Sequence, residues 1–300
     1  MSQLLYEGLE NRFVAWAVTE PTMRSAVVVG SRARQDHPAD KWSDLDIICF
    51  TSTPDRFTSN IQWIKQLGTI WFCADKTANS GDFEWMVMFE GGIKVDFIIA
   101  PAAAPLRQML ANPIYEKARR RGVRLLFDKT NAQTDCDELP PATSRDVPQP
   151  SMEALVRHVN LLWITVGRTA TMIGRGELWR AVPLCNSDLK QLLLTMIEWH
   201  ARATYGPQHD IWRNGRFLHE WAAPPTNDML KTAFAQYNQT DLHHALQQTA
   251  RLFSRLSREV TAVWEYEYPY ESEHNLLQWL ETLPSNATKL NKPSSYTTTS

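Results

Sequence analysis

The feature that most constrains this 300-residue chain is a β-branched run ending in glycine and serine, followed by two aspartates one residue apart. The first run is Val27-Val28-Val29-Gly30-Ser31, and the second is Ser43-Asp44-Leu45-Asp46-Ile47-Ile48. Residues i and i+2 of a strand point to the same face of a sheet, so Asp44 and Asp46 are expected side by side. Adjacent carboxylates repel each other unless a cation lies between them. The spacing therefore predicts a cation site at the start of a strand.

A third carboxylate, Asp96, lies inside the apolar run Ile93–Ile99. Three carboxylates on neighbouring strands that face a Gly-Ser turn predict a divalent-metal and triphosphate site. Mg²⁺ prefers carboxylate oxygens together with substrate phosphates, and two ions about 4 Å apart suit in-line displacement at phosphorus. We predict that Asp44 and Asp46 bridge two Mg²⁺ ions. Asp96 is expected beside the acceptor hydroxyl, as a metal ligand, the general base or both.

The segment between the two runs offers groups for the phosphates of ATP. Gly30 allows a close approach of the backbone, and Ser31 offers an amide and a hydroxyl to the β- and γ-phosphates. Arg32 and Arg34 can add charge-assisted hydrogen bonds. Together with the three aspartates, these residues predict a catalytic nucleotidyltransferase that uses ATP as its co-substrate.

Composition excludes several other classes of protein. The formal net charge is −2 and the isoelectric point is near 6.5, whereas dedicated nucleic-acid binders usually carry a basic face and a high isoelectric point. The N-terminus lacks a basic region followed by an apolar core, and no apolar run approaches the length that spans a membrane. We therefore expect a cytoplasmic protein that binds neither nucleic acid nor membrane.

The first half of the chain predicts an α+β domain with a mixed sheet. Strands are expected at Ala26–Val29, Leu45–Phe50, Thr69–Cys73, Trp85–Phe89, Lys94–Ile99 and Val123–Phe127. Gly91-Gly92 predicts a hairpin turn between the fourth and fifth strands. Apolar spacing predicts an amphipathic helix over Leu4–Val18, with Leu5 and Val18 among its apolar positions, and a second helix over Pro54–Gln66.

The second half has a helical pattern. Ser151 predicts the N-cap of a helix reaching about Ile173, Ser187 predicts the cap of a helix ending near Gly206, and a third helix is expected over Asp241–Trp264. These helices favour a bundle. We expect a sheet domain over residues 1–130, a linker over 131–150, a helical substrate-binding domain over 151–283, a disordered tail over 284–300, and an active site in the cleft between the two domains.

Short segments spread over the whole chain carry a resemblance to one family. They are Gly30-Ser31-Arg32, Ser43-Asp44-Leu45-Asp46, Lys94-Val95-Asp96-Phe97, Leu162-Trp163-Ile164, Arg175-Gly176-Glu177-Leu178, Met196-Ile197-Glu198-Trp199 and Glu267-Tyr268-Pro269. Over about residues 1–283 the chain resembles the aminoglycoside 6-adenylyltransferase (streptomycin adenylyltransferase) family of the polymerase-β-like nucleotidyltransferases. The resemblance implies an antibiotic-resistance enzyme that transfers AMP from ATP to the 6-hydroxyl of streptomycin and releases pyrophosphate.

A guanidinium-bearing acceptor of this kind is recognised by carboxylates and aromatic faces. Candidate acceptor-binding residues are Glu84, Trp85, Glu90, Trp163, Glu177 and Glu198. Basic residues of the helical half that could contact the triphosphate are Arg168, Arg175, Lys190 and Arg202. Packing within the core is the competing explanation for each aromatic candidate.

Two other functions remain open on the sequence. One is a nucleotidyltransferase of the same fold that acts on another acceptor, such as a different drug or a protein hydroxyl. The other is a non-catalytic sensor of a nucleotide or a metal. The intact set of Asp44, Asp46 and Asp96 favours an enzyme over a sensor.

Overall fold

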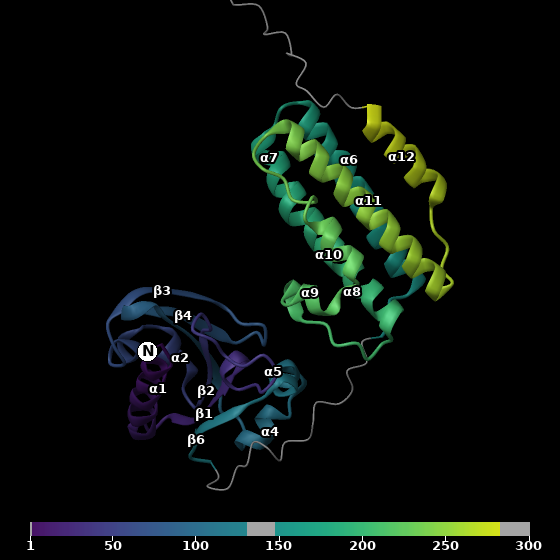
Figure 1. The fold of residues 1–300 in the computed structure, drawn as a ribbon. Helices are drawn as coiled ribbons and strands as arrows, with labels where there is room; N and C mark the ends of the chain where they lie inside the picture. The colour runs from purple at the N-terminus through teal and green to yellow at the C-terminus, as the bar shows by residue number, and fades with distance from the viewer. Residues whose placement is uncertain (1, 131–147, 283–300) are drawn as a thin grey trace, which may run out of the picture. The chain divides into compact units, whose positions relative to one another are not determined.

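The computed structural model describes residues 2–130 and 148–282 (Figure 1). The chain divides into two compact units, residues 1–144 and 145–300. Residues 131–147 of the predicted linker, the last residue of the predicted helical domain and the predicted tail lie outside the described residues. No described helix is both long and apolar enough to cross a membrane.

The first unit is built on one six-stranded sheet. Its strands are β1 (Met23–Val29), β2 (Leu45–Thr51), β3 (Ile70–Thr77), β4 (Phe83–Phe89), β5 (Ile93–Pro101) and β6 (Arg124–Asp128). Their order across the sheet is β3-β4-β5-β2-β1-β6. The central pair β2 and β5 is parallel, and the other neighbours are antiparallel. The predicted mixed sheet and all six predicted strands are confirmed.

One long helix, α1, and several short helices and turns accompany this sheet. They are α1 (Ser2–Thr19), the 3₁₀ turn η1 (Gly30–Arg32), α2 (Pro54–Thr58), α3 (Gln62–Lys65), the 3₁₀ turns η2 (Glu90–Gly92) and η3 (Pro113–Tyr115), α4 (Leu106–Leu110) and α5 (Glu116–Arg121). The predicted hairpin between β4 and β5 is confirmed, since Gly91 and Gly92 both take a positive φ, at 82° and 76°.

Two details of the predicted helices were wrong. The helix expected over Pro54–Gln66 is broken into α2 and α3, because the Asn60 side chain accepts a hydrogen bond from the backbone N–H of Gln62 and makes a turn there. In α1 the buried face is formed by Tyr6, Leu9, Phe13 and Ala17. Leu5 and Val18, expected on that face, are exposed at 44% and 52%.

The two faces of the sheet are covered differently. One face packs against α1, α2 and α3 along β1, β2, β4 and β5, through residues such as Phe13, Trp63 and Phe97 (Figure 1). The opposite face packs against α4 and η3 through a smaller cluster that includes Phe50 and Leu110. That cluster draws on β1, β2 and the end of β5, and contains no residue of β3 or β4 among the described residues. Polar side chains can therefore occupy this face along β3, β4 and the first half of β5.

The second unit is helical. Its elements are α6 (Met152–Gly174), α7 (Leu178–Pro183), the π-helical turn η5 (Leu184–Asp188), α8 (Leu189–Tyr205), η6 (Arg213–Gly215), α9 (Leu218–Trp221), α10 (Pro224–Leu230), α11 (Gln239–Trp264) and α12 (Tyr270–Thr282). The long helices α6, α8 and α11 run alongside one another and share one core (Figure 1). The predicted bundle is confirmed.

Of the two N-caps predicted for these helices, the structure confirms one. Ser151 accepts a hydrogen bond from the backbone N–H of Ala154, as its predicted N-cap role requires. The cap predicted at Ser187 was wrong, because the chain is already helical from Leu178 and passes through η5 into α8 without a break. The third predicted helix is α11, which begins at Gln239. Its N-cap is Asn238, whose side chain accepts a hydrogen bond from the backbone N–H of Asp241.

Candidate active site

A row of ionisable side chains crosses four strands on the less covered face of the sheet. Asp46 of β2 pairs in register with Asp96 of β5, so both carboxylates point to the same face. On β4, Met86 pairs with Asp96, and Glu84 lies two residues further along on that same face. Glu84 pairs in turn with Lys76 of β3. The order of the strands, not the order of the sequence, makes these residues neighbours.

The three predicted aspartates come together. Asp44, Asp46 and Asp96 are half-buried, and each offers an oxygen that lies within 4.8 Å of the oxygens offered by the other two. Asp44 precedes β2 and is not part of the strand, so the same-face rule does not place it. The loop that precedes β2 positions Asp44 instead. Arg32 holds this loop by donating hydrogen bonds to the backbone carbonyl oxygens of Ser43 and Asp44, both at 3.0 Å.

The Gly-Ser turn after β1 lies directly against this cluster. Gly30 has a φ of 72°, and a Cβ at this position would collide with the carboxylate of Asp46. Position 30 must therefore be glycine for two reasons, its backbone angle and the space that Asp46 occupies. The Ser31 hydroxyl oxygen is buried and has no hydrogen-bond partner in the described part of the chain. A buried polar atom of this kind is expected to meet a ligand or water.

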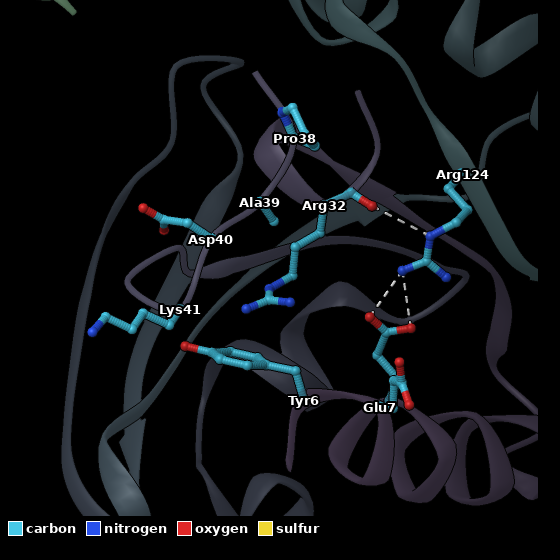
Figure 2. A pocket seen from close by; sticks show the side chains of 9 residues that line it. Tyr6, Glu7, Arg32, Pro38, Ala39, Asp40, Lys41 and Arg124 are labelled. Atoms are coloured by element: carbon cyan, nitrogen blue, oxygen red, sulfur yellow. Dashed lines mark hydrogen bonds and ion pairs between the residues drawn. The ribbon is translucent and has the colours of Figure 1, made fainter. Parts of the chain in front are cut away.

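The two predicted nucleotide-binding arginines are engaged with the protein. Besides its bonds to the loop, the Arg32 guanidinium lies over the Tyr6 ring (Figure 2). Its distance from the ring centre is 3.5 Å. Arg32 lines a cavity of about 580 Å³ formed by α1, the loop 38–41 and Arg124, and none of the three aspartates lines that cavity. Arg34 donates to the carbonyl oxygen of His37 at 2.6 Å. The structure thus shows Arg32 positioning the aspartate loop, while its contact with a nucleotide stays a prediction.

Electrostatics in the row are unfavourable without a cation. Burial, a hydrogen bond with Glu84 and the charge of that residue raise the pKa of Asp96 to about 7, with a further contribution from Asp44. Lys76 opposes this rise, since its Nζ lies 3.0 Å from Glu84 Oε1 and 3.8 Å from Asp96 Oδ2. Although partial burial acts against it, the pKa of Lys76 is raised by Glu84, Asp96 and Asp46.

These observations fit a divalent cation. Three half-buried carboxylates with converging oxygens are the ligand type that Mg²⁺ takes, and a bound cation would offset the burial and the neighbouring negative charges that raise the pKa of Asp96. Asp44, Asp46 and Asp96 are the residues that would hold it. The unpartnered hydroxyl of Ser31, next to Gly30, is suited to a phosphate oxygen at the same place.

Of the acceptor candidates in the first unit, only Glu84 belongs to this row. Its side chain is buried, with 5% of the residue exposed. Trp85, the next residue of β4, faces the opposite side of the sheet, where its indole donates to the carbonyl oxygen of Phe57 at 2.8 Å. Glu90 is exposed in the turn between β4 and β5. We therefore assign Trp85 to the core and leave it and Glu90 out of the proposed site.

The second unit holds the other three candidates. Trp163 is buried and packs edge-on against Phe253, so its indole is part of the helical core. Glu177 pairs with Arg180 at 2.8 Å. Glu198 is half-buried on α8, and burial raises its pKa although Arg202 acts against the rise. Among the three candidates of the second unit, Glu198 is the carboxylate whose pKa is raised by burial.

The basic candidates of the second unit also differ from one another. Lys190 is buried, and its Nζ donates to the carbonyl oxygen of Cys185 and to the hydroxyl of Thr249, each at 2.8 Å. These bonds hold Lys190 inside the bundle, so we exclude it from the proposed triphosphate contacts. Arg168 and Arg175 lie in or directly after α6, and Arg202 lies on α8.

Sequence reasoning missed Lys76. The third strand was expected to end at Cys73, but β3 continues to Thr77 and brings Lys76 opposite Glu84. The signal that could have found it is the polar turn Asn79-Ser80-Gly81-Asp82, which joins β3 and β4 as a hairpin and extends both strands toward it.

Comparisons with known proteins point to one family. A family model described as streptomycin adenylyltransferase matches residues 6–283. An aminoglycoside 6-adenylyltransferase from Campylobacter jejuni is 23% identical over 264 residues, which is 86% of this chain and 88% of the relative. One from Bacillus subtilis is 21% identical over 265 residues, 86% of this chain and 90% of the relative. A crystal structure of an aminoglycoside 6-adenyltransferase from Bacillus subtilis superposes with a TM-score of 0.42 at 18% identity, covering 91% of this chain and 96% of that one.

Proposed function

This chain belongs to the streptomycin adenylyltransferase family and is a nucleotidyltransferase, and we propose that it transfers AMP from Mg-ATP to the 6-hydroxyl of streptomycin, releasing pyrophosphate. The observation that carries the proposal is the convergence of Asp44, Asp46 and Asp96 beside the Gly30-Ser31 turn. Converging carboxylates next to an unpartnered buried hydroxyl suit a metal-bound triphosphate better than they suit any neutral ligand.

In the proposed reaction the acceptor hydroxyl oxygen forms a bond to the α-phosphorus, and the bond from that phosphorus to the bridging oxygen of the β-phosphate breaks. Divalent cations supply charge neutralisation of the triphosphate when they are bound. In this proposal Asp96 would take the hydroxyl proton in its ionised form, and its raised pKa of about 7 in the metal-free protein supports a carboxylate that can accept a proton. The Ser31 hydroxyl and the backbone at Gly30 would hold the phosphates.

Recognition of a cationic acceptor is supported by the carboxylates that remain. Glu84 and Glu198 are both withdrawn from solvent, and a guanidinium or ammonium group of the acceptor would compensate their charge. Glu177 is a weaker candidate, since its side chain is 31% exposed and already pairs with Arg180, whereas the side chain of Glu84, although it pairs with Lys76, is only 7% exposed. Trp163 would act through the shape of the helical core around Phe253 and not by direct stacking on the acceptor.

The experiment that tests this function is pyrophosphate release by the purified chain with Mg-ATP and a panel of aminoglycosides, with mass spectrometry of the product. Streptomycin should gain one AMP at its 6-hydroxyl. Asp46→Asn should abolish the release, whereas Asp75→Asn, an exposed aspartate on β3, should leave it near the wild-type rate.

The same panel separates the alternatives. Release with another acceptor and not with streptomycin would leave a nucleotidyltransferase of different specificity. Binding of Mg-ATP without any release, across the whole panel, would support a non-catalytic sensor and overturn the proposal.

A further inference from the structure

Lys76 places an ammonium group at the edge of a site suited to a metal cation. Its Nζ lies 3.0 Å from Glu84 Oε1 and 3.8 Å from Asp96 Oδ2, and the charge of Asp46 also reaches it. The side chain is 44% exposed, while that of Glu84 is 7% exposed. The lysine thus reaches from an exposed position to a buried carboxylate.

The packing of the first unit does not account for this arrangement. β3 is an edge strand that pairs with β4 alone, and Lys76 lies near its end, with most of the strand exposed. An exposed ion pair at such a place contributes little to stability. What distinguishes Lys76 is that its ammonium group contacts two carboxylates of the row at once, Glu84 at 3.0 Å and Asp96 at 3.8 Å.

We propose that Lys76 is a resident counter-cation of the carboxylate row, which holds Glu84 and Asp96 together in the metal-free protein and competes with a free divalent cation for that site. This inference rests on the proposed metal site. A carboxylate that is paired with an ammonium attracts a free ion less strongly than an unpaired one. The site should therefore fill poorly with the free ion and well with the metal–nucleotide complex, whose phosphates give the ammonium a new partner.

The test is a titration of the full-length protein with Mn²⁺, in which free Mn²⁺ is followed by electron paramagnetic resonance, with and without a non-hydrolysable ATP analogue. Without nucleotide, Lys76→Met should bind Mn²⁺ roughly fivefold more tightly than wild type, the size expected for a partly exposed ion pair. With the analogue, that advantage should shrink or reverse. Lys76→Arg, which keeps the charge, should behave as wild type.

Lys94→Met is the matched control. Lys94 lies two residues from Asp96 on β5, but its Nζ donates to the backbone carbonyl oxygen of Trp42 at 3.0 Å and to none of the carboxylates. Its replacement should change the Mn²⁺ affinity by less than about twofold, since a solvent-exposed charge without a direct pair is well screened. Lys76→Gln serves as a second variant if the methionine variant does not fold.

The outcomes separate this inference from the proposed function. If neither wild type nor Lys76→Met binds Mn²⁺, with or without the analogue, or if Asp46→Asn binds it equally well, the metal site itself is wrong. If wild type binds Mn²⁺ through Asp46 but Lys76→Met and Lys76→Gln bind it with unchanged or weaker affinity, or if Lys94→Met changes the affinity as much as Lys76→Met does, the role of Lys76 is overturned.

Discussion

At the scale of single residues, neighbours decide what each carboxylate of the row can do. Asp46 has Asp96 as its register partner, and Asp96 has Glu84 and Lys76 beside it. Asp44 is held from its backbone by Arg32. One aspartate is thus fixed by a strand, one by a loop, and one shares a hydrogen bond with a fourth carboxylate. The third of these is Asp96, whose pKa is raised by burial and by Glu84.

Replacement of Asp96 by asparagine tests this difference. Asp96→Asn should still bind ATP through Asp44, Asp46 and Ser31 but should lose about 10²- to 10⁴-fold in rate, because the amide cannot accept the hydroxyl proton. Calorimetry with the ATP analogue and steady-state pyrophosphate release check the two parts. Joint loss of binding and turnover would make Asp96 chiefly a metal ligand, and a normal rate with a normal pH profile would move the base to Glu84.

At the scale of elements, the turn that follows β1 sets the distance between backbone and carboxylate. Gly30 has a positive φ, and a Cβ at this position would collide with the carboxylate of Asp46. Gly81 also has a positive φ, of 89°, but a Cβ there would have no atom within 4 Å. The two glycines have comparable backbone angles and different surroundings. They therefore separate the cost of the backbone angle from the cost of the contact.

Alanine at both positions should lower stability by about 1 kcal/mol through the left-handed angle. Gly30→Ala should lower it further and should also weaken Mn²⁺ binding, since its Cβ displaces the Asp46 carboxylate. Thermal unfolding and Mn²⁺ titration of the two variants give the comparison. Equal melting temperatures and equal metal affinities would show that the contact with Asp46 has no consequence.

The helix α8 carries a glutamate, Glu198, whose ionised form is disfavoured by its partial burial. Burial raises the pKa of Glu198 above the ordinary 4.5, so the folded chain holds this proton more tightly than the unfolded chain. The protonated Glu198 carboxyl therefore contributes to the free energy of unfolding at pH values below its pKa in the unfolded chain. That contribution is lost as the pH rises through its pKa in the folded chain. A residue that opposes folding at neutral pH is a candidate for function.

Glu198→Gln should accordingly raise the melting temperature at pH 8 and raise it less at pH 5. The neutral amide avoids the cost of a half-buried charge, and at the lower pH the wild-type carboxyl is closer to neutral itself. Glu177→Gln is the control, since it removes a carboxylate that Arg180 already compensates. A loss of stability in Glu198→Gln at both pH values would show that the charge is fully satisfied in the native state.

At the scale of the whole molecule, candidate acceptor carboxylates are found in both units while the net charge is only −2. Attraction of a cationic drug must then come from local charge, such as Glu84 and Glu198, and not from the overall field of the protein. Local attraction of this kind is still weakened by salt wherever the carboxylates are open to solvent.

Streptomycin binding, measured by calorimetry, should weaken as the salt concentration rises, and should weaken further in Glu84→Gln or Glu198→Gln. Since Glu198→Gln is expected to stabilise the fold, its weaker binding cannot be ascribed to unfolding. Glu153→Gln, an exposed glutamate at the start of α6, should bind as wild type does. Unchanged affinity in both test variants would remove both residues from the proposed acceptor contacts.

The sequence by itself was enough to predict the six strands, the long helices and the convergence of the three aspartates. Each of these follows from local rules: alternation of apolar residues, helical spacing, caps, and carboxylates at a strand start. The same alternation rule places Trp85 on the opposite face from Glu84, so that correction needed no tertiary structure. The family followed from short segments distributed over the chain.

Only the tertiary structure decided which residues surround those aspartates. Lys76 and Glu84 meet Asp96 because β3 and β4 lie beside β5 in the sheet, an order that local patterns do not encode. Arg32 binds the backbone of Ser43 and Asp44 because the loop folds back over it, and Lys190 is buried because α8 packs on α11. Strand order, loop closure and helix packing arise from contacts between distant segments, and these contacts determine whether a charged side chain is free to bind a substrate.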